Sequence, residues 1–169
     1  MNRGALFTAS DLAVIDRAVP VAEGLTRTFF GLADNEWKRN PYGIFTLGQV
    51  RGDLYQEGVF ARLVRYDRRS RIPDGKGPGQ KFGIVLQDPN ILSALFRSHR
   101  HDLWTLVLFV LTHELVHIVR FRRFGVDFDA SDRELVQEER LVHDITREIL
   151  AGVANTDFVL GLYESQFGP

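Results

Sequence analysis

Residues 103–111 read LWTLVLFVL, and this almost unbroken apolar run constrains the fold more than any other feature of the chain. A helix that is apolar on every side is buried, either in the middle of a globular domain or in a membrane. The run is well short of the roughly 18 apolar residues that a membrane span needs. It also leads directly into the polar residues His113 and Glu114. We therefore predict a helix at the centre of a globular domain, with no membrane as a partner.

Start and stop signals give this helix its bounds. Asp102 can cap its beginning, arginines up to Arg123 suit the negative end of its dipole, and Gly125 can end it. The next helix has a clear start, because Ser131 and Glu134 have the spacing of a capping box. We expect that second helix to run to about residue 150.

The rest of the chain predicts a mixture of helices and strands. Ser10 is a candidate cap for a first helix, and Pro20 is expected to open a second one that runs to about residue 32. The remaining predicted elements are strands at Ile44–Val50, Val59–Tyr66 and Phe82–Gln87, and short helices at Pro89–Arg97 and Asp157–Tyr163. The second strand alternates without a purely apolar face, which is typical of an edge or partly exposed strand. The predicted fold class is α+β, in one domain over residues 1–169.

Composition limits the functions that this domain can have. With 169 residues, of which 44% are apolar, the chain can bury one proper core. A net charge of −1 speaks against nucleic acid as a partner, although arginines cluster at residues 62–71 and 120–123. Each cluster fits either a solvated face or a surface for an acidic partner. The N-terminus lacks the continuous apolar core of a secretion signal, so a cytoplasmic location is expected.

The pentapeptide His113-Glu114-Leu115-Val116-His117 fits the pattern H-E-x-x-H. On a helix, residues four apart are stacked neighbours, so His113 and His117 can bind the same ion, and neutral imidazole suits zinc. Glu114 lies about 100° around the helix, where it can take a proton from a water molecule on the metal. The chain has no cysteine, so the remaining ligands must be histidine or carboxylate. The alternative is a pair of core histidines that other polar groups satisfy.

Zinc with two histidine ligands needs a third ligand and leaves one position for water. The helix that Ser131 begins offers Glu138, Glu139 and His143. We favour Glu139 as the ligand, because it shares a polar stripe with His143 across an otherwise apolar face of that helix. Glu138 and His143 remain alternatives for the third ligand. His143 is otherwise expected to orient a ligand, to donate to a developing oxyanion, or to be a plain core histidine.

The motif, followed about twenty residues later by a helix that bears Glu139, resembles the zincin metallopeptidases, and among them the gluzincins, whose third ligand is glutamate. The resemblance covers residues 103 to about 150. It implies a small twisted sheet packed on the central H-E-x-x-H helix and on the following Glu-bearing helix. In several gluzincins the residue four after the ligand glutamate supports the first histidine, but His143 stands here where those relatives usually have aspartate. The resemblance also implies an edge strand beside the active-site helix, for which Phe82–Gln87 is the candidate; an interior strand is the alternative.

The function that these residues predict is hydrolysis of peptide bonds by a zinc-activated water molecule. Glu114 would act as the general base and return the proton to the leaving amine, and the substrate would be a peptide or a protein. A first alternative is a zincin-like regulatory or protein-binding domain with narrow or no proteolysis. A second is a structural metal site, which would have no need of Glu114. The sequence leaves substrate, any activating partner and oligomeric state open.

Overall fold

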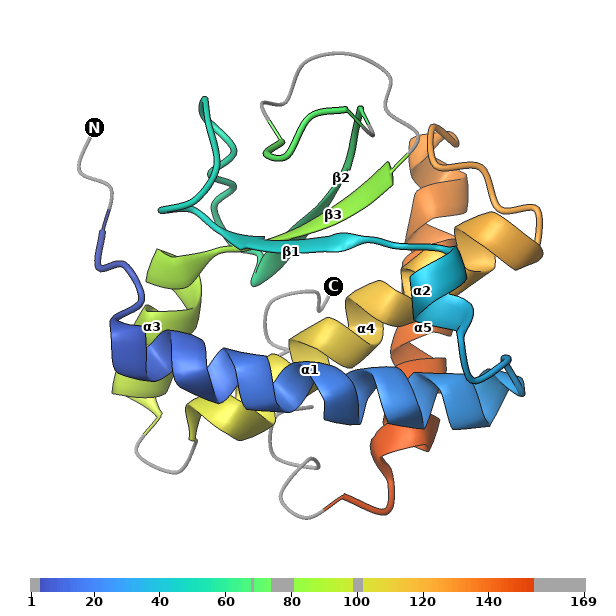
Figure 1. Ribbon diagram of the computed structural model, residues 1–169, viewed down its shortest axis with the longest axis horizontal. Helices are drawn as coiled ribbons and strands as arrows, with labels where there is room; N and C mark the ends of the chain where they lie inside the picture. Colours follow the sequence, from blue (N-terminus) through green and yellow to red (C-terminus); the bar gives the residue numbers. More distant parts are fainter. Residues whose placement is uncertain (1–3, 68, 74–80, 99–101, 154–169) are drawn as a thin grey trace.

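Five helices and a three-stranded sheet make up the part of the chain that the structure describes, and the predicted α+β class is confirmed (Figure 1). The structure is a computed structural model and describes residues 4–67, 69–73, 81–98 and 102–153. The predicted helix Asp157–Tyr163 lies outside these residues. The elements are α1 (Ala9–Phe30), α2 (Glu36–Arg39), β1 (Gly43–Thr46), β2 (Ala61–Tyr66), β3 (Lys81–Leu86), α3 (Asp88–Arg97), α4 (Leu103–Arg123) and α5 (Asp132–Leu150).

Helix α4 lies at the centre of the fold, as its apolar run predicts. It packs mainly against α1, and Figure 1 shows it crossing between α1 and the sheet. Fourteen of its 21 residues are buried, among them both members of the pair His113 and Glu114. The predicted cap is confirmed, because the Asp102 side chain accepts from the Thr105 N–H at 2.7 Å. The helix ends before Gly125, which takes the left-handed φ of 66°.

By length and hydropathy, α4 would be able to cross a membrane, because its apolar character continues through the H-E-x-x-H motif over 21 residues. The nine-residue run therefore understates how apolar the whole helix is. However, 78% of its most apolar window is buried inside the fold. Such burial is also what the core helix of a globular domain requires.

The sheet has the order β1-β3-β2, with β3 parallel to β1 and antiparallel to β2. The prediction that Phe82–Gln87 forms an edge strand is wrong, because β3 pairs on both sides. Five of its six residues are buried, since Ile84 and Leu86 face the α4 core and Val85 packs into a second cluster on the other face. Strand β2 lies at the edge, as the alternation of its residues indicates.

Helix α1 is continuous where the sequence predicted two helices. It begins after Thr8 rather than Ser10, because Thr8 and Asp11 form a capping box. Pro20 lies inside the helix and not at the start of a second one. Proline removes one backbone donor, which leaves the carbonyl group of Asp16 without its helical partner. Both residues are exposed, so water can satisfy that carbonyl group and the helix continues.

Helix α5 begins with the predicted capping box of Ser131 and Glu134. Its first half is largely exposed, and only Val142, Thr146 and Leu150 are fully buried in the second half. Leu135 and Leu141 belong to the apolar positions of the helical pattern, yet they are 37% and 43% exposed. The half of α5 that carries the candidate ligands therefore has few apolar contacts to fix it.

Candidate metal centre

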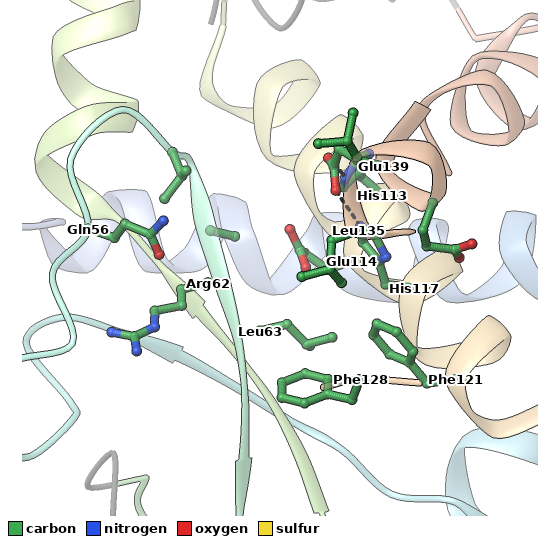
Figure 2. Close-up of a pocket in the computed structure, with 14 residues that line it drawn as sticks. Gln56, Arg62, Leu63, His113, Glu114, His117, Phe121, Phe128, Leu135 and Glu139 are labelled. Atoms are coloured by element: carbon green, nitrogen blue, oxygen red, sulfur yellow. Dashed lines mark hydrogen bonds and ion pairs between the residues drawn. The ribbon is translucent and has the colours of Figure 1, made fainter. Parts of the chain in front are cut away.

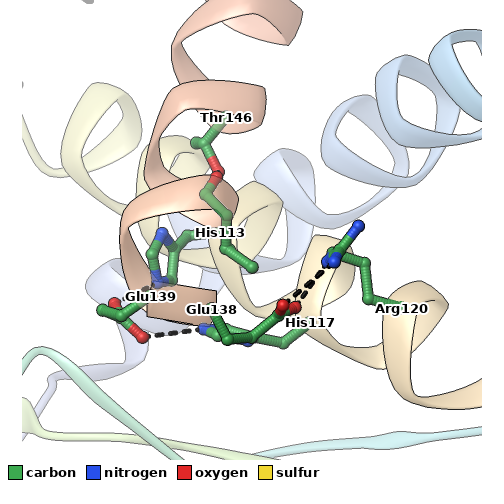
Figure 3. Close-up of polar contacts among 7 residues, drawn as sticks. His113, His117, Arg120, Glu138, Glu139 and Thr146 are labelled. Carbon is green, nitrogen blue, oxygen red and sulfur yellow. Dashed lines mark hydrogen bonds and ion pairs between the residues drawn. The ribbon is translucent and has the colours of Figure 1, made fainter. Parts of the chain in front are cut away.

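Three candidate ligands from two helices converge at one point. Glu139 Oε1 lies 2.8 Å from His113 Nε2, and Glu139 Oε2 lies 3.0 Å from His117 Nε2 (Figure 3). One ligand atom from each residue fits within 4.8 Å of the others. The stacking of His113 and His117 follows from their spacing of four, and their rings lie 4.9 Å apart. The geometry is compatible with a metal site.

Glu138 is excluded from this cluster by a partner of its own. Its two carboxylate oxygens accept from Arg120 on α4, one from Nε and the other from Nη2 at 2.9 Å (Figure 3). Both side chains are largely buried, at 14% and 10% exposure. Neighbouring glutamates on α5 therefore bind different residues of α4, and the structure brings Glu139 rather than Glu138 to the histidines.

The arginines at residues 120–123 bind partners within the fold. Besides the pair between Arg120 and Glu138, Arg123 binds the buried carboxylate of Glu36 at 2.7 Å. Arg122 donates to the backbone carbonyl groups of Asn40 and Pro41. These three arginines hold α2, the loop after it and α5 against the end of α4. Their partners explain the cluster without an external acidic molecule.

Burial and hydrogen bonding shift the three candidate ligands in different directions. Burial lowers the pKa of His113, which favours the neutral form that binds a metal. Burial acts against the charged form of His117 too, but its bond to Glu139 and nearby carboxylates leave its pKa raised. Burial disfavours the ionised form of Glu139, yet the bonds from both histidines outweigh it and hold its pKa well below the usual range. In the absence of an ion, Glu139 is thus an ionised acceptor shared by two imidazoles.

Glu114 lines the cavity beside this cluster. It is only 6% exposed, and Figure 2 shows its carboxylate directed toward the cavity. Burial raises its pKa to about 7, with the charge of Glu139 adding to the effect and His117 opposing it. The residue next to His113 is therefore a carboxyl group that exchanges a proton near neutral pH.

The cavity has a volume of about 470 Å³ and lies between β2 and α5 (Figure 2). Opposite the histidines its wall comes from β2 and the segment before it. The sequence did not point to this wall or to the aromatic pair Phe121 and Phe128. Phe121 could have been found, because it follows His117 by four residues and continues the histidine stripe of α4. The lining residues are Gln56, Val59, Ala61, Arg62, Leu63, His113, Glu114, His117, Phe121, Phe128, Leu135, Val136, Glu138 and Glu139.

His143 lies one turn beyond Glu139 on α5 and does not line the cavity. The centroid of its ring is 6.0 Å from that of Phe109, and the His113 ring stacks on the same phenylalanine with the centroids 6.4 Å apart. His143 thus shares the ring of Phe109 with His113 and lies outside the lining of the cavity. This position is suited to supporting His113 rather than to contacting a reacting group.

The donor set fits a divalent transition metal. Two imidazole Nε2 atoms and a carboxylate face one point, and zinc, with its preference for nitrogen and oxygen ligands, accepts such a set. His113 and His117 come from a mostly buried helix that holds their positions. No protein-family model, curated protein or solved structure matches the chain.

Proposed function

We propose that this protein is a zinc-dependent peptidase of the zincin type. The observation that carries the proposal is the convergence of His113, His117 and Glu139 at one end of a cavity that Glu114 also lines. His113, His117 and Glu139 would hold the ion, and three protein ligands are the number typical of catalytic zinc sites. Bound zinc supplies Lewis acidity, which polarises a carbonyl group and makes a water molecule acidic.

The protein's own residues would do the rest of the chemistry. Glu114 takes the proton from the attacking water and delivers it to the leaving amine, as a general base and then a general acid. The apolar side chains of Phe121, Phe128 and Leu63 line this end of the cavity and would exclude solvent once a peptide covers them. His143 would steady His113 through the ring of Phe109 that both contact.

A peptide would bind as an added strand on β2. Among the described residues this strand pairs with β3 alone, so its other edge is free next to the cavity. It can take the part that the resemblance gives to Phe82–Gln87. Main-chain hydrogen bonds to an edge strand hold an extended peptide whatever its side chains are. Such a mode suits a hydrolase of peptide bonds better than one of small molecules.

The test begins with metal content. Mass spectrometry of the purified protein for metals should find about one zinc per chain, and His113→Ala should lose it. Asp144→Ala, at an exposed residue of α5 outside the cluster, is the control and should keep it. If the wild-type protein neither retains nor takes up zinc, the proposal fails.

Activity is tested on a mixture of denatured proteins, with new N-termini mapped by peptide mass spectrometry. The zinc-loaded wild type should cut the mixture. Glu114→Gln should keep the metal and lose cleavage, whereas Glu148→Gln, an exposed control on α5, should cut normally. Full cleavage by Glu114→Gln would refute the general base. Zinc binding without any cleavage would favour the regulatory alternative.

A further inference from the structure

The free edge of β2 offers a defined set of backbone groups. The Gln87 N–H donates to the Phe60 carbonyl group at 2.8 Å, and the antiparallel register continues with Arg62 opposite Val85. Because hydrogen-bonded pairs alternate along an antiparallel ladder, Phe60, Arg62 and Val64 direct their backbone groups toward β3. The N–H and carbonyl groups of the residues between them, such as Leu63, therefore point outward to the free edge.

The side chains of β2 divide between the two faces of the sheet. Ala61 and Leu63 belong to the core on the α4 face, whereas Val64 packs with Val85 in the cluster on the opposite face. Arg62 alternates with Ala61 and Leu63, so it lies on the same face as Val64. A peptide strand paired with β2 would alternate in the same way. Residues level with Ala61 and Leu63 would face the metal side, and the residue level with Arg62 would lie beside its side chain.

Arg62 has a guanidinium group without an acceptor among the described residues, although its side chain is half-buried. Other arginines around the site are paired with carboxylates: Arg65 with Asp129, and Arg120 with Glu138. Figure 2 places Arg62 beside Gln56, at the end of the cavity away from the histidines.

The backbone that carries Gln56 is fixed to the end of the sheet. Gln87, which is fully buried, accepts from the Gln56 N–H at 2.8 Å and donates to the Leu54 carbonyl group at 3.2 Å. Asn90 donates to the Gln56 carbonyl group at 2.9 Å. Gln56, whose backbone is held in this way, and Arg62 thus place amide and guanidinium donors in the same wall of the cavity. Such donors match a carboxylate, because guanidinium binds its two oxygens at once.

We propose that Arg62, with Gln56, recognises a carboxylate of the bound peptide at the position level with Arg62. The substrate class is an extended peptide with an acidic group there, between residues with apolar side chains that face Leu63, Phe121 and Phe128. This inference rests on the proposed peptide-binding function. The carboxylate can be an aspartate or glutamate side chain, or a free C-terminus.

The experiment measures binding to zinc-loaded Glu114→Gln protein, in which cleavage does not interfere. The probes are acetyl-ALELA-amide, acetyl-ALQLA-amide and acetyl-ALQL with a free carboxyl terminus, each titrated by nuclear magnetic resonance. We expect the glutamate peptide to bind about 10-fold tighter than the glutamine peptide, since a hydrogen bond to a charged group contributes strongly. A larger gain for acetyl-ALQL than for the glutamate peptide would identify the C-terminus as the preferred source.

The preference should depend on Arg62, which supplies the positive charge. Adding Arg62→Gln should bring the ratio of the two affinities close to one. Arg69→Gln, which removes an exposed charge from the same basic segment outside the cavity lining, should keep the ratio. Equal binding of all three peptides, no binding of any, or an unchanged ratio in Arg62→Gln would overturn the inference. Cleavage of proteins without a preference for acidic residues would refute the role of Arg62 and leave the proposed peptidase function standing. A binding preference for the acidic peptide without any cleavage would refute the peptidase function and leave the role of Arg62 standing.

Discussion

The ion pair between Arg120 and Glu138 gives the sharpest test of how α5 is held. Both side chains are at most 14% exposed, and the guanidinium group binds both carboxylate oxygens. Replacing Arg120 with methionine keeps most of the side-chain volume and leaves the Glu138 carboxylate almost buried without its partner. Breaking a buried pair in this way costs about 3–5 kcal/mol, whereas exposed pairs contribute about 0–1 kcal/mol. With about a tenth of each side chain in water, we expect a loss near 3 kcal/mol.

The assay is urea denaturation of the metal-free protein, with thermal melts in support. A loss of about 3 kcal/mol corresponds to roughly 6–12 °C in a chain of this size. The double variant Arg120→Met, Glu138→Met should recover most of the stability, because no buried charge is left alone. Arg27→Met is the control, since its partner Asp34 is 96% exposed, and it should cost under about 1 kcal/mol.

Zinc affinity is the second measurement on the same variants. Glu138 adjoins Glu139, so losing its anchor lets the ligand move, and such supporting contacts are worth about 10–100-fold in metal affinity. Competition with a chelator should detect this drop in Arg120→Met and none in Arg27→Met. The reasoning is refuted if Arg120→Met costs less than about 1 kcal/mol and binds zinc as tightly as the wild type.

Three further predictions concern other parts of the fold. Zinc at 100 times its dissociation constant should stabilise the wild type by about 2.7 kcal/mol in thermal melts, and any such rise in His117→Ala would contradict its role as ligand. Asp88→Ala should cost about 2–3 kcal/mol in urea, because the buried carboxylate accepts the N–H groups of Phe7 and Leu47. Burial raises the pKa of Asp88, so the folded state binds its proton more readily than the unfolded state does. The free energy of unfolding of the wild type should therefore fall as pH rises from about 4 through the pKa of the folded state. Asp88→Ala should lack this part of the pH dependence. Gly83→Ala should lower the free energy of unfolding by about 1–3 kcal/mol in thermal melts, because the added Cβ would lie 3.0 Å from the buried Tyr66 ring.

The features that the sequence predicted well depend on neighbours along the chain. The i, i+4 spacing stacks His113 and His117, and Asp102, Ser131 and Glu134 cap helices through contacts within one turn. The preference for Glu139 came from the same helical periodicity, which separates it from Glu138 by about 100°. Local geometry was therefore enough to stack the two histidines and to separate Glu139 from Glu138, whereas the packing of α5 against α4 brings Glu139 to the histidines.

Contacts between distant segments decided the rest. Whether β3 is central or at an edge depends on β1, which pairs with it from about 40 positions earlier in the chain and cannot be inferred from the apolar character of β3. Pro20 does not end α1, because the exposed side of that helix tolerates a missing donor. The role of Glu138 depends on Arg120, and the cavity wall depends on where β2 lies, and neither follows from spacing.

The uneven burial of α4 and α5 has a consequence for how the site would exchange its metal. His113 and His117 belong to a core helix of mostly buried residues, and we expect its amide groups to become accessible only when the whole domain unfolds. Glu139 belongs to a half-helix with little apolar surface buried, which can open locally at much lower free energy. Extraction of the ion by a chelator should therefore follow the local opening of α5, with the two histidines still in place to receive a new ion.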